Sequence, residues 1–129
     1  MDTPVASLPV TFTAPMPGFE DLHDFVLRSV EGAAGLYALE AGSSPVRLFL
    51  AVAAVFAPSY APPIPAASLE ALELDEREAP QVLIVVNHSA GSTTVNLMAP
   101  IVLNRGTGRC TQLVLDGRDF PLRVELNSL

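Results

Sequence analysis

Residues 95–104 read VNLMAPIVLN, an apolar run with an asparagine near each end and a proline in its middle. Such a run favours a buried β-strand. Pro100 has no backbone N–H, so the hydrogen-bond ladder must be interrupted there and the segment is expected to kink. The side-chain amides of Asn96 and Asn104 can bond backbone groups that this interruption leaves unpaired. We therefore predict a structural role for Asn96, Pro100 and Asn104.

Short strands are predicted on both sides of this segment. Residues 8–12 alternate between apolar and other side chains, the period of a strand with one buried face, and Pro9 indicates that this strand lies at a sheet edge. Residues 46–56 predict a strand buried on both faces, and residues 82–86 predict a central strand. The remaining strands are expected within residues 25–27, 35–41, 111–115 and 120–126, the last two joined by an Asp116-Gly117 turn.

One short helical segment is predicted in the middle of the chain. Four prolines between positions 58 and 65 fix φ and remove backbone donors, so they predict a loop. The leucines of residues 66–74 come close to helical spacing, and Ser68 can cap the first turn with its hydroxyl oxygen. We expect one or two helical turns over this segment.

The fold class follows from these elements. The chain has 129 residues, of which 50% are hydrophobic, which suits one domain with a compact core over residues 1–129. Several short strands at close spacing with almost no helix are typical of an antiparallel barrel or sandwich. We predict a mainly β, small antiparallel β-barrel-like single domain with one short helical segment.

The charge balance narrows the classes of function. Fourteen acidic residues stand against seven basic ones, and the net charge is −7. A nucleic-acid-binding protein needs a basic stripe to neutralise phosphates, and this sequence has none. Direct nucleic-acid binding is therefore not expected, whereas a basic protein partner would be attracted.

The apolar character of the chain requires a check for membrane segments. Mean hydropathy is +0.40, yet the longest apolar run, residues 48–57, has about half of the ~20 residues that a spanning helix needs. The first residues do not have the pattern of a secretory signal. Cys110 is the single cysteine, which excludes an internal disulfide and suits a reducing compartment. We predict a cytoplasmic protein without a membrane segment.

No catalytic, cofactor-binding or metal site is predicted. His23 and His88 have no further ligands at metal spacing. The chain has no nucleophile elbow of the form GxSxG, and residues 106–108 lack the lysine of a phosphate-binding loop.

Two alternatives to a non-enzymatic binding protein stay open. One is a small β-barrel that binds a flavin or another small ligand, although no basic residues cluster to hold a phosphate. The other is a purely structural subunit of an assembly.

An acidic run follows the predicted helix. Its members surround one base, Arg77, and are Glu70, Glu73, Asp75, Glu76 and Glu78. Such runs often serve only to solvate a protein surface. This acidic run can also form a binding surface for a basic partner, and the two roles are compatible.

Residues 95–104 closely resemble the signature of the flagellar assembly factor FliW family, V-N-L-x-A-P-I-V-x-N. The similarity extends in order and spacing over nearly the whole chain. Residues 16–20 (MPGFE) resemble an L-P-G-F-E element of the family, and residues 111–115 with 120–123 resemble its C-terminal strand pair.

Some positions depart from the family pattern. Residues 56–60 (FAPSY) fall where the family has an aromatic residue, a proline and an Asp-Tyr pair, so Ser59 replaces the aspartate. Residues 52–54 (VAA) stand where an acidic Asp-Pro pair is common, and residues 110–112 (CTQ) replace a plainer pattern. If those acids contact a partner, affinity here is weaker or the contact has moved elsewhere on the surface.

The resemblance implies a non-enzymatic cytoplasmic flagellar assembly factor. Similar proteins bind flagellin and, once flagellin has been exported, bind the RNA-binding translational regulator CsrA and lift its repression of flagellin translation. The acidic charge fits this role, because CsrA must carry a basic surface that contacts RNA. We expect the free protein to be a monomer without a cofactor.

The resemblance and the acidic run together indicate where partners bind. Phe19 belongs to the L-P-G-F-E-like turn and could equally pack in the core. The expected partner-binding residues are Phe19, Glu20, Tyr60, Glu70, Glu73, Asp75 and Glu76.

Overall fold

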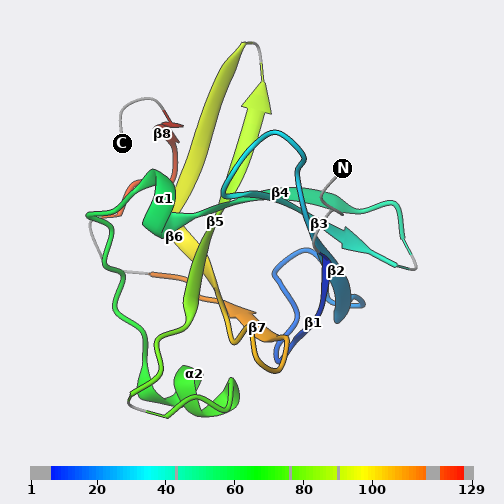
Figure 1. The fold of residues 1–129 in the computed structure, drawn as a ribbon, viewed down its shortest axis with the longest axis vertical. Helices are drawn as coiled ribbons and strands as arrows, with labels where there is room; N and C mark the ends of the chain where they lie inside the picture. The colour runs from blue at the N-terminus through cyan, green and yellow to red at the C-terminus, as the bar shows by residue number, and fades with distance from the viewer. Residues whose placement is uncertain (1–6, 43, 76, 90, 116–119, 127–129) are drawn as a thin grey trace.

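A computed structural model describes residues 7–42, 44–75, 77–89, 91–115 and 120–126 (Figure 1). Within these residues strands predominate, and two short helices follow the fourth strand. The elements in chain order are β1 (Ser7–Phe12), β2 (Asp24–Ser29), β3 (Leu36–Ala41), β4 (Arg47–Val52), α1 (Ala53–Phe56), α2 (Ala66–Ala71), β5 (Gln81–Ser89), β6 (Ser92–Leu103), β7 (Arg109–Gln112) and β8 (Val124–Glu125).

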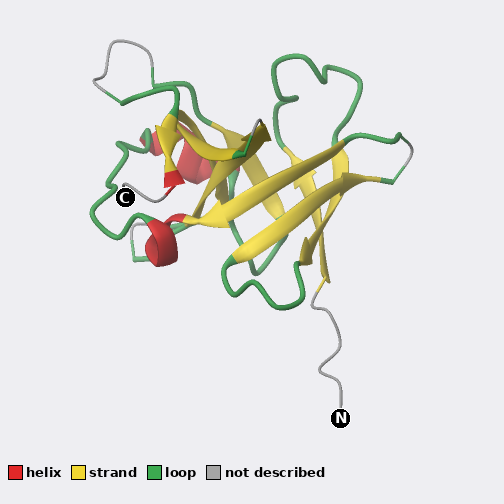
Figure 2. Ribbon diagram, turned by 90° about the horizontal axis from the view of Figure 1, so that it is seen from above, coloured by secondary structure: helices red, strands yellow, loops and turns green. Residues whose placement is uncertain are grey.

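Seven of the described strands close into a barrel. Neighbours pair in the order β5-β4-β3-β2-β1-β7-β6, β6 pairs back with β5, and the short β8 adds to β6. The β1–β7 pair is parallel and the other pairs are antiparallel. Seen from above, both helices lie on one side of the barrel strands (Figure 2). The mainly β barrel is confirmed, with one parallel pair and one helix, α1, that the sequence did not predict.

The barrel interior is filled by side chains that alternate along each strand. Phe12 and Phe25 pack edge to face there, with ring centroids 5.2 Å apart. The space left among the interior side chains is about 10 Å³, which is close to the minimum for one water molecule. The interior therefore has no room for a flavin or a similar ligand.

Two further apolar clusters lie on the outside of the barrel. Ala51, Ile84 and Val95 are fully buried because α1, the loop after it and the C-terminal segment cover them. Helix α2 covers the second cluster, which includes Val102 of β6. Residues 82–86 therefore form a central strand that is covered on both faces, as predicted.

The strand predicted over residues 46–56 ends earlier than expected. β4 stops at Val52, and α1 adds one helical turn that brings Phe56 onto the outer apolar cluster. The first half is not buried on both faces either, because Phe49 is 38% exposed. A short apolar run has no periodicity that separates a buried strand from a helix packed on a sheet, and this explains the error.

The prediction that β1 lies at a sheet edge is wrong. β1 pairs with β2 on one side and with β7 on the other. Pro9 is tolerated because the bonding toward β7 begins only at Thr11, whose N–H donates to Gly108 O at 2.8 Å. The backbones are so close at this crossing that a Cβ on Gly108 would lie 2.4 Å from Pro9 O.

Two other predicted boundaries are wrong. Of the strand expected over residues 120–126, only Val124–Glu125 pair as β8. Helix α2 begins directly after Pro65, so Ser68 lies inside the helix and does not cap it. The turn expected at Asp116-Gly117 lies outside the described residues.

β6 carries the signature segment and is interrupted near Pro100, as predicted. Leu83 pairs with Ile101 and Val85 with Asn96, so the β6 residues between Asn96 and Ile101 oppose a single residue of β5. This irregularity is an enlarged β-bulge, in which residues 97–100 of β6 lie opposite Ile84 of β5. Pro100 lies within it, where its missing N–H costs no ladder bond with β5.

Candidate partner-binding site

The bulge in β6 organises the loop that follows α1. Asn96 Oδ1 accepts a hydrogen bond from Met98 N–H at 2.9 Å, the kind of side-chain-to-backbone contact expected of this asparagine. Leu97 N–H donates to Pro121 O at 3.1 Å, and Leu97 O accepts a bond from the Tyr60 hydroxyl. The loop after α1 and the C-terminal segment therefore meet at the bulge.

Tyr60 forms one wall of an apolar groove. Its ring meets Phe120 edge to face, with centroids 5.4 Å apart. Burial raises the pKa of Tyr60 to about 12, so its hydroxyl stays a neutral donor to the bulge at neutral pH. The groove has a volume of about 370 Å³ and is lined by Ala57, Pro58, Ser59, Tyr60, Ala61, Leu97 and Phe120. It can receive an apolar side chain, and none of its lining residues is a cation that could hold a phosphate.

The turn between β1 and β2 places Phe19 and Glu20 in different environments. Phe19 is half-buried and packs against the barrel core, and its N–H donates to Met16 O at 2.9 Å. Glu20 is exposed, and its carboxylate accepts a bond from Gly18 N–H at 2.6 Å. Phe19 thus has a packing role in this fold, while Glu20 presents its charge to solvent.

Helix α2 ends in a Schellman turn. Leu74 N–H donates to Leu69 O at 3.0 Å and Glu73 N–H donates to Glu70 O at 2.9 Å, which are the two bonds of that motif. Glu73 adopts a left-handed φ of 60° at the position that glycine usually takes. The turn reverses the chain and returns the buried Leu74 to the cluster beneath α2.

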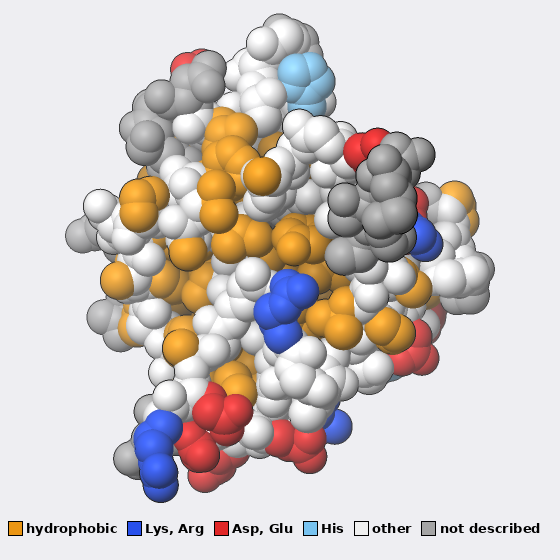
Figure 3. Space-filling model, viewed as in Figure 1, with side chains coloured by type: hydrophobic (Ala, Val, Ile, Leu, Met, Phe, Trp, Pro, Cys, Tyr) orange, Lys and Arg blue, Asp and Glu red, His pale blue; other side chains and the backbone are white. Residues whose placement is uncertain are grey.

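The exposed acids of α2 and its turn form what we call the acidic cluster: Glu70, Glu73, Asp75 and Glu78. Glu76 lies outside the described residues. Figure 3 shows acidic side chains gathered at the lower end of the molecule, where Figure 1 places α2. Arg109 reaches Glu73 at 4.0 Å, a distance at the limit of an ion pair. The cluster therefore presents several carboxylates to a partner.

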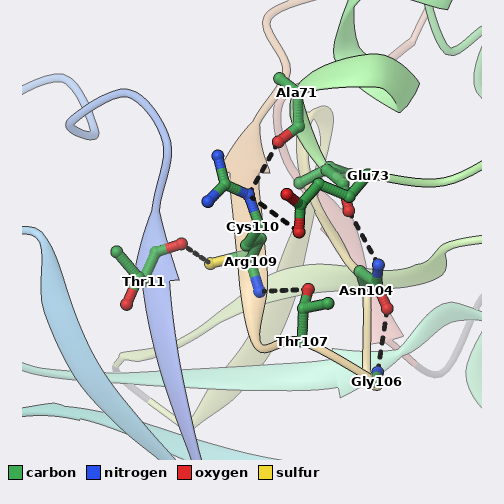
Figure 4. A network of polar contacts seen from close by, with 9 residues as sticks. Thr11, Ala71, Glu73, Asn104, Gly106, Thr107, Arg109 and Cys110 are labelled. Carbon is green, nitrogen blue, oxygen red and sulfur yellow. Dashed lines mark hydrogen bonds and ion pairs between the residues drawn. The ribbon is translucent and has the colours of Figure 1, made fainter.

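The sequence predicted that Asn104 bonds backbone groups at the interruption near Pro100, and this is wrong. Its side chain bonds backbone groups beyond the end of β6. Its Nδ2 donates to Leu72 O at 2.8 Å, and its Oδ1 accepts from Gly106 N–H at 2.9 Å (Figure 4). Asn104 is 8% exposed and has both ends of its amide bonded. It joins the β6–β7 turn to the end of α2.

The structure brings only part of the predicted set together. The acidic cluster shares one surface, whereas Tyr60 belongs to the loop after α1 and Phe19 with Glu20 to the turn between β1 and β2. Sequence reasoning missed Phe120 as the partner of Tyr60 and Arg109 as a contact of α2. Neither residue has a local pattern that marks it, because each contact joins segments far apart in the chain.

Replacing Glu73 with glycine is expected to stabilise the fold. Relief of the left-handed strain gains about 1–2 kcal/mol, and the extra chain entropy of glycine costs about 0.5–1 kcal/mol. The contact with Arg109 adds little, because the Glu73 side chain is 61% exposed. Urea unfolding should therefore show a gain of about 0.5–1 kcal/mol.

Glu70→Gly is the matched control for this prediction. Glu70 lies within the helix, where the same substitution removes helix propensity and should destabilise by about 1 kcal/mol. If both variants lose stability equally, the strain at Glu73 has no energetic consequence.

The described residues give little support for metal or thiol chemistry. Among them, no three His, Cys, Asp or Glu side chains gather to hold a metal ion. Burial raises the pKa of Cys110 to about 12, so its thiol stays protonated and weakly nucleophilic. In the same part of the chain, no helix combines the length and apolarity required to cross a membrane.

The chain is similar to proteins of one family. The family model described as FliW protein matches residues 3–126. Identity to the flagellar assembly factor FliW of Thermotoga maritima is 32% over 117 residues, which cover 88% of this chain and 78% of that protein. Identity to the protein of the same name from Desulfitobacterium hafniense strain DSM 10664 / DCB-2 is 31% over 120 residues, which cover 91% and 79%.

The fold agrees with these matches. A crystal structure of the flagellar assembly factor FliW aligns with a TM-score of 0.83 and 24% identity, over 92% of this chain and 84% of that one. At 24% identity this alignment supports the fold alone. The assignment to a family rests on the family model and on the relatives. This chain therefore belongs to the FliW family.

Proposed function

We propose that this chain is a non-enzymatic flagellar assembly factor that binds flagellin and, when free of flagellin, binds CsrA and relieves its repression of flagellin translation. Membership of the FliW family, over residues 3–126, is the observation that carries the proposal. In this proposal the protein acts in the cytoplasm, where translation takes place, and is a monomer between its two partners.

The acidic cluster is the proposed contact for CsrA. A protein that binds RNA needs a basic surface, and opposite potentials accelerate encounter and select among partners. The cluster is exposed and projects from one segment, α2 and its turn, on a chain whose net charge is −7. Glu70, Glu73 and Asp75 are the proposed contact residues among the described positions, and Glu76 belongs to the same run of sequence.

The groove beside Tyr60 is a second proposed contact, suited to an apolar side chain of a partner. Glu20 is a third, since its carboxylate is exposed. Phe19 is the weakest of the proposed contacts, because its ring packs against the barrel core.

A flavin-binding barrel finds no support in these features. The interior leaves about 10 Å³ of free space, and the residues that line the groove beside Tyr60 include no cation for a phosphate.

Calorimetric titration of the purified protein with CsrA of the same organism, with and without flagellin, tests the proposal. We expect CsrA to bind and flagellin to abolish that binding. Binding of flagellin without CsrA would leave a chaperone and remove the regulatory role. Binding of neither partner would refute the proposed function.

A further inference from the structure

Two side chains at the ends of the β6–β7 turn hold the end of helix α2. Asn104 Nδ2 donates to Leu72 O at 2.8 Å, and Arg109 Nε donates to Ala71 O at 3.0 Å (Figure 4). Arg109 Nε also lies 4.0 Å from Glu73 Oε1. The last carbonyl groups of a helix have no partner within the helix, so these two donors complete α2 from outside.

Helix α2 depends on such contacts because it is short. It spans six residues, Ala66–Ala71, and a helix of that length has no stability of its own in water. Its N-terminal end has no side-chain cap. Leu69 of α2 and the two leucines that follow the helix, Leu72 and Leu74, also attach it to the barrel, and Leu72 is fully buried in the cluster that includes Val102 of β6.

Among the described residues, the hydrogen bonds and the ion pair of these two side chains reach α2, its turn and Gly106, and none of them joins two strands of the barrel. Leu103 is the last residue of β6, and its pairing with Cys110 uses backbone groups. Asn104 continues this pairing through its backbone N–H, which donates to Arg109 O at 2.9 Å. The Asn104 side-chain amide is hydrogen-bonded to Leu72 O at the end of α2 and to Gly106 N–H in the turn. The guanidinium of Arg109 is hydrogen-bonded to Ala71 O of α2 and lies within ion-pair distance of Glu73.

We propose that Asn104 and Arg109 are positioning residues, which fix α2 and the acidic cluster on the barrel so that its carboxylates meet a partner in one arrangement. A cluster that is already ordered binds more tightly, because less conformational entropy is lost when the complex forms. The claim about the partner rests on the proposed function, whereas the docking of α2 by these side chains stands independently of it.

Hydrogen exchange of Asn104→Ala, followed by mass spectrometry or NMR, tests the docking. The change leaves the buried Leu72 O without a donor, so the amides of residues 72–74 should exchange about tenfold faster or more. Amides of β2, β3 and β4 should keep their rates. Affinity for CsrA should fall by about tenfold, because the loosened acidic cluster must be ordered again when the complex forms.

Arg109→Gln gives a second, milder variant, and Arg105→Gln is its matched control. Both remove one positive charge, Arg105 within the β6–β7 turn and Arg109 directly after it. Arg105 bonds Gln81 through its Nη1 at 2.6 Å and has no described contact with α2. We expect Arg109→Gln to loosen residues 72–74 and weaken CsrA binding, and Arg105→Gln to do neither.

Three results would overturn the inference. Unchanged exchange at residues 72–74 in both variants would show that the two donors do not hold α2. Equal acceleration throughout the barrel would make Asn104 a residue of the barrel's own stability. Loosened α2 with unchanged CsrA affinity would remove the positioning role and leave the proposed function intact. Failure of the unmodified protein to bind CsrA would instead refute the proposed function, while the exchange rates would still decide the docking.

Discussion

Gly108→Ala is expected to destabilise the protein by about 3 kcal/mol or more, because two independent costs add. Gly108 has a φ of +81°, where an L-residue pays about 1–2 kcal/mol. The added Cβ would also lie 2.4 Å from Pro9 O, a backbone atom that cannot swing away as a side chain does. To relieve that contact, β1 must move off β7 at the parallel pair that closes the barrel.

Gly91→Ala is the control for this prediction. Gly91 has a similar φ of +78°, and a Cβ there meets nothing within 4 Å. It therefore carries the conformational cost alone, about 1–2 kcal/mol. Urea unfolding of the three proteins measures the difference. Equal losses in the two variants would show that the close approach to Pro9 has no role in closing the barrel.

Reversal of two charges in the acidic cluster is expected to weaken CsrA binding by about 100-fold. In Glu70→Lys/Glu78→Lys, attraction to a basic surface becomes repulsion, and like charges brought together cost several kcal/mol. Both side chains are exposed, so the fold should remain intact. The loss should appear mainly in the association rate and should shrink as the salt concentration rises.

Asp21→Lys/Glu31→Lys is the matched control, since it makes the same change in net charge at exposed positions outside α2. Stopped-flow association at low and high salt compares the two double variants with the unmodified protein. Equal slowing in both would mean that net charge, and not the acidic cluster, governs encounter with CsrA.

Much of the fold could be predicted from local patterns. Alternating side chains marked β1, and the apolar run at residues 82–86 marked the centre of β5. The proline at position 100 marked an interruption that appears as the bulge in β6. These predictions succeeded because strand period and missing backbone donors act over a few neighbouring residues.

The errors have one common cause. Pro9 indicated an edge strand, but β1 is flanked on both sides by β2 and β7. The proline is tolerated because β7 begins to pair only at Thr11. Residues 53–56 continued an apolar run, yet they form a helix that covers the outer face of the barrel. In both cases the deciding contact comes from a segment that local sequence does not identify.

The candidate site divides in the same way. The acidic run was evident from sequence, and the structure gathers its described members on α2 and the following turn. The groove needed Tyr60, Leu97 and Phe120 to meet. The partner-binding roles of these residues remain predictions for the experiments above.

By itself, the sequence determined the strand-rich class, the acidic charge and the family, because composition, period and signature words are properties of the chain alone. Only the tertiary structure decided that β1 and β7 close the barrel in parallel and that Asn104 and Arg109 complete helix α2. The physical reason is that a backbone donor or acceptor must be satisfied wherever the fold buries it. Which distant residue satisfies it depends on how the strands are ordered in space.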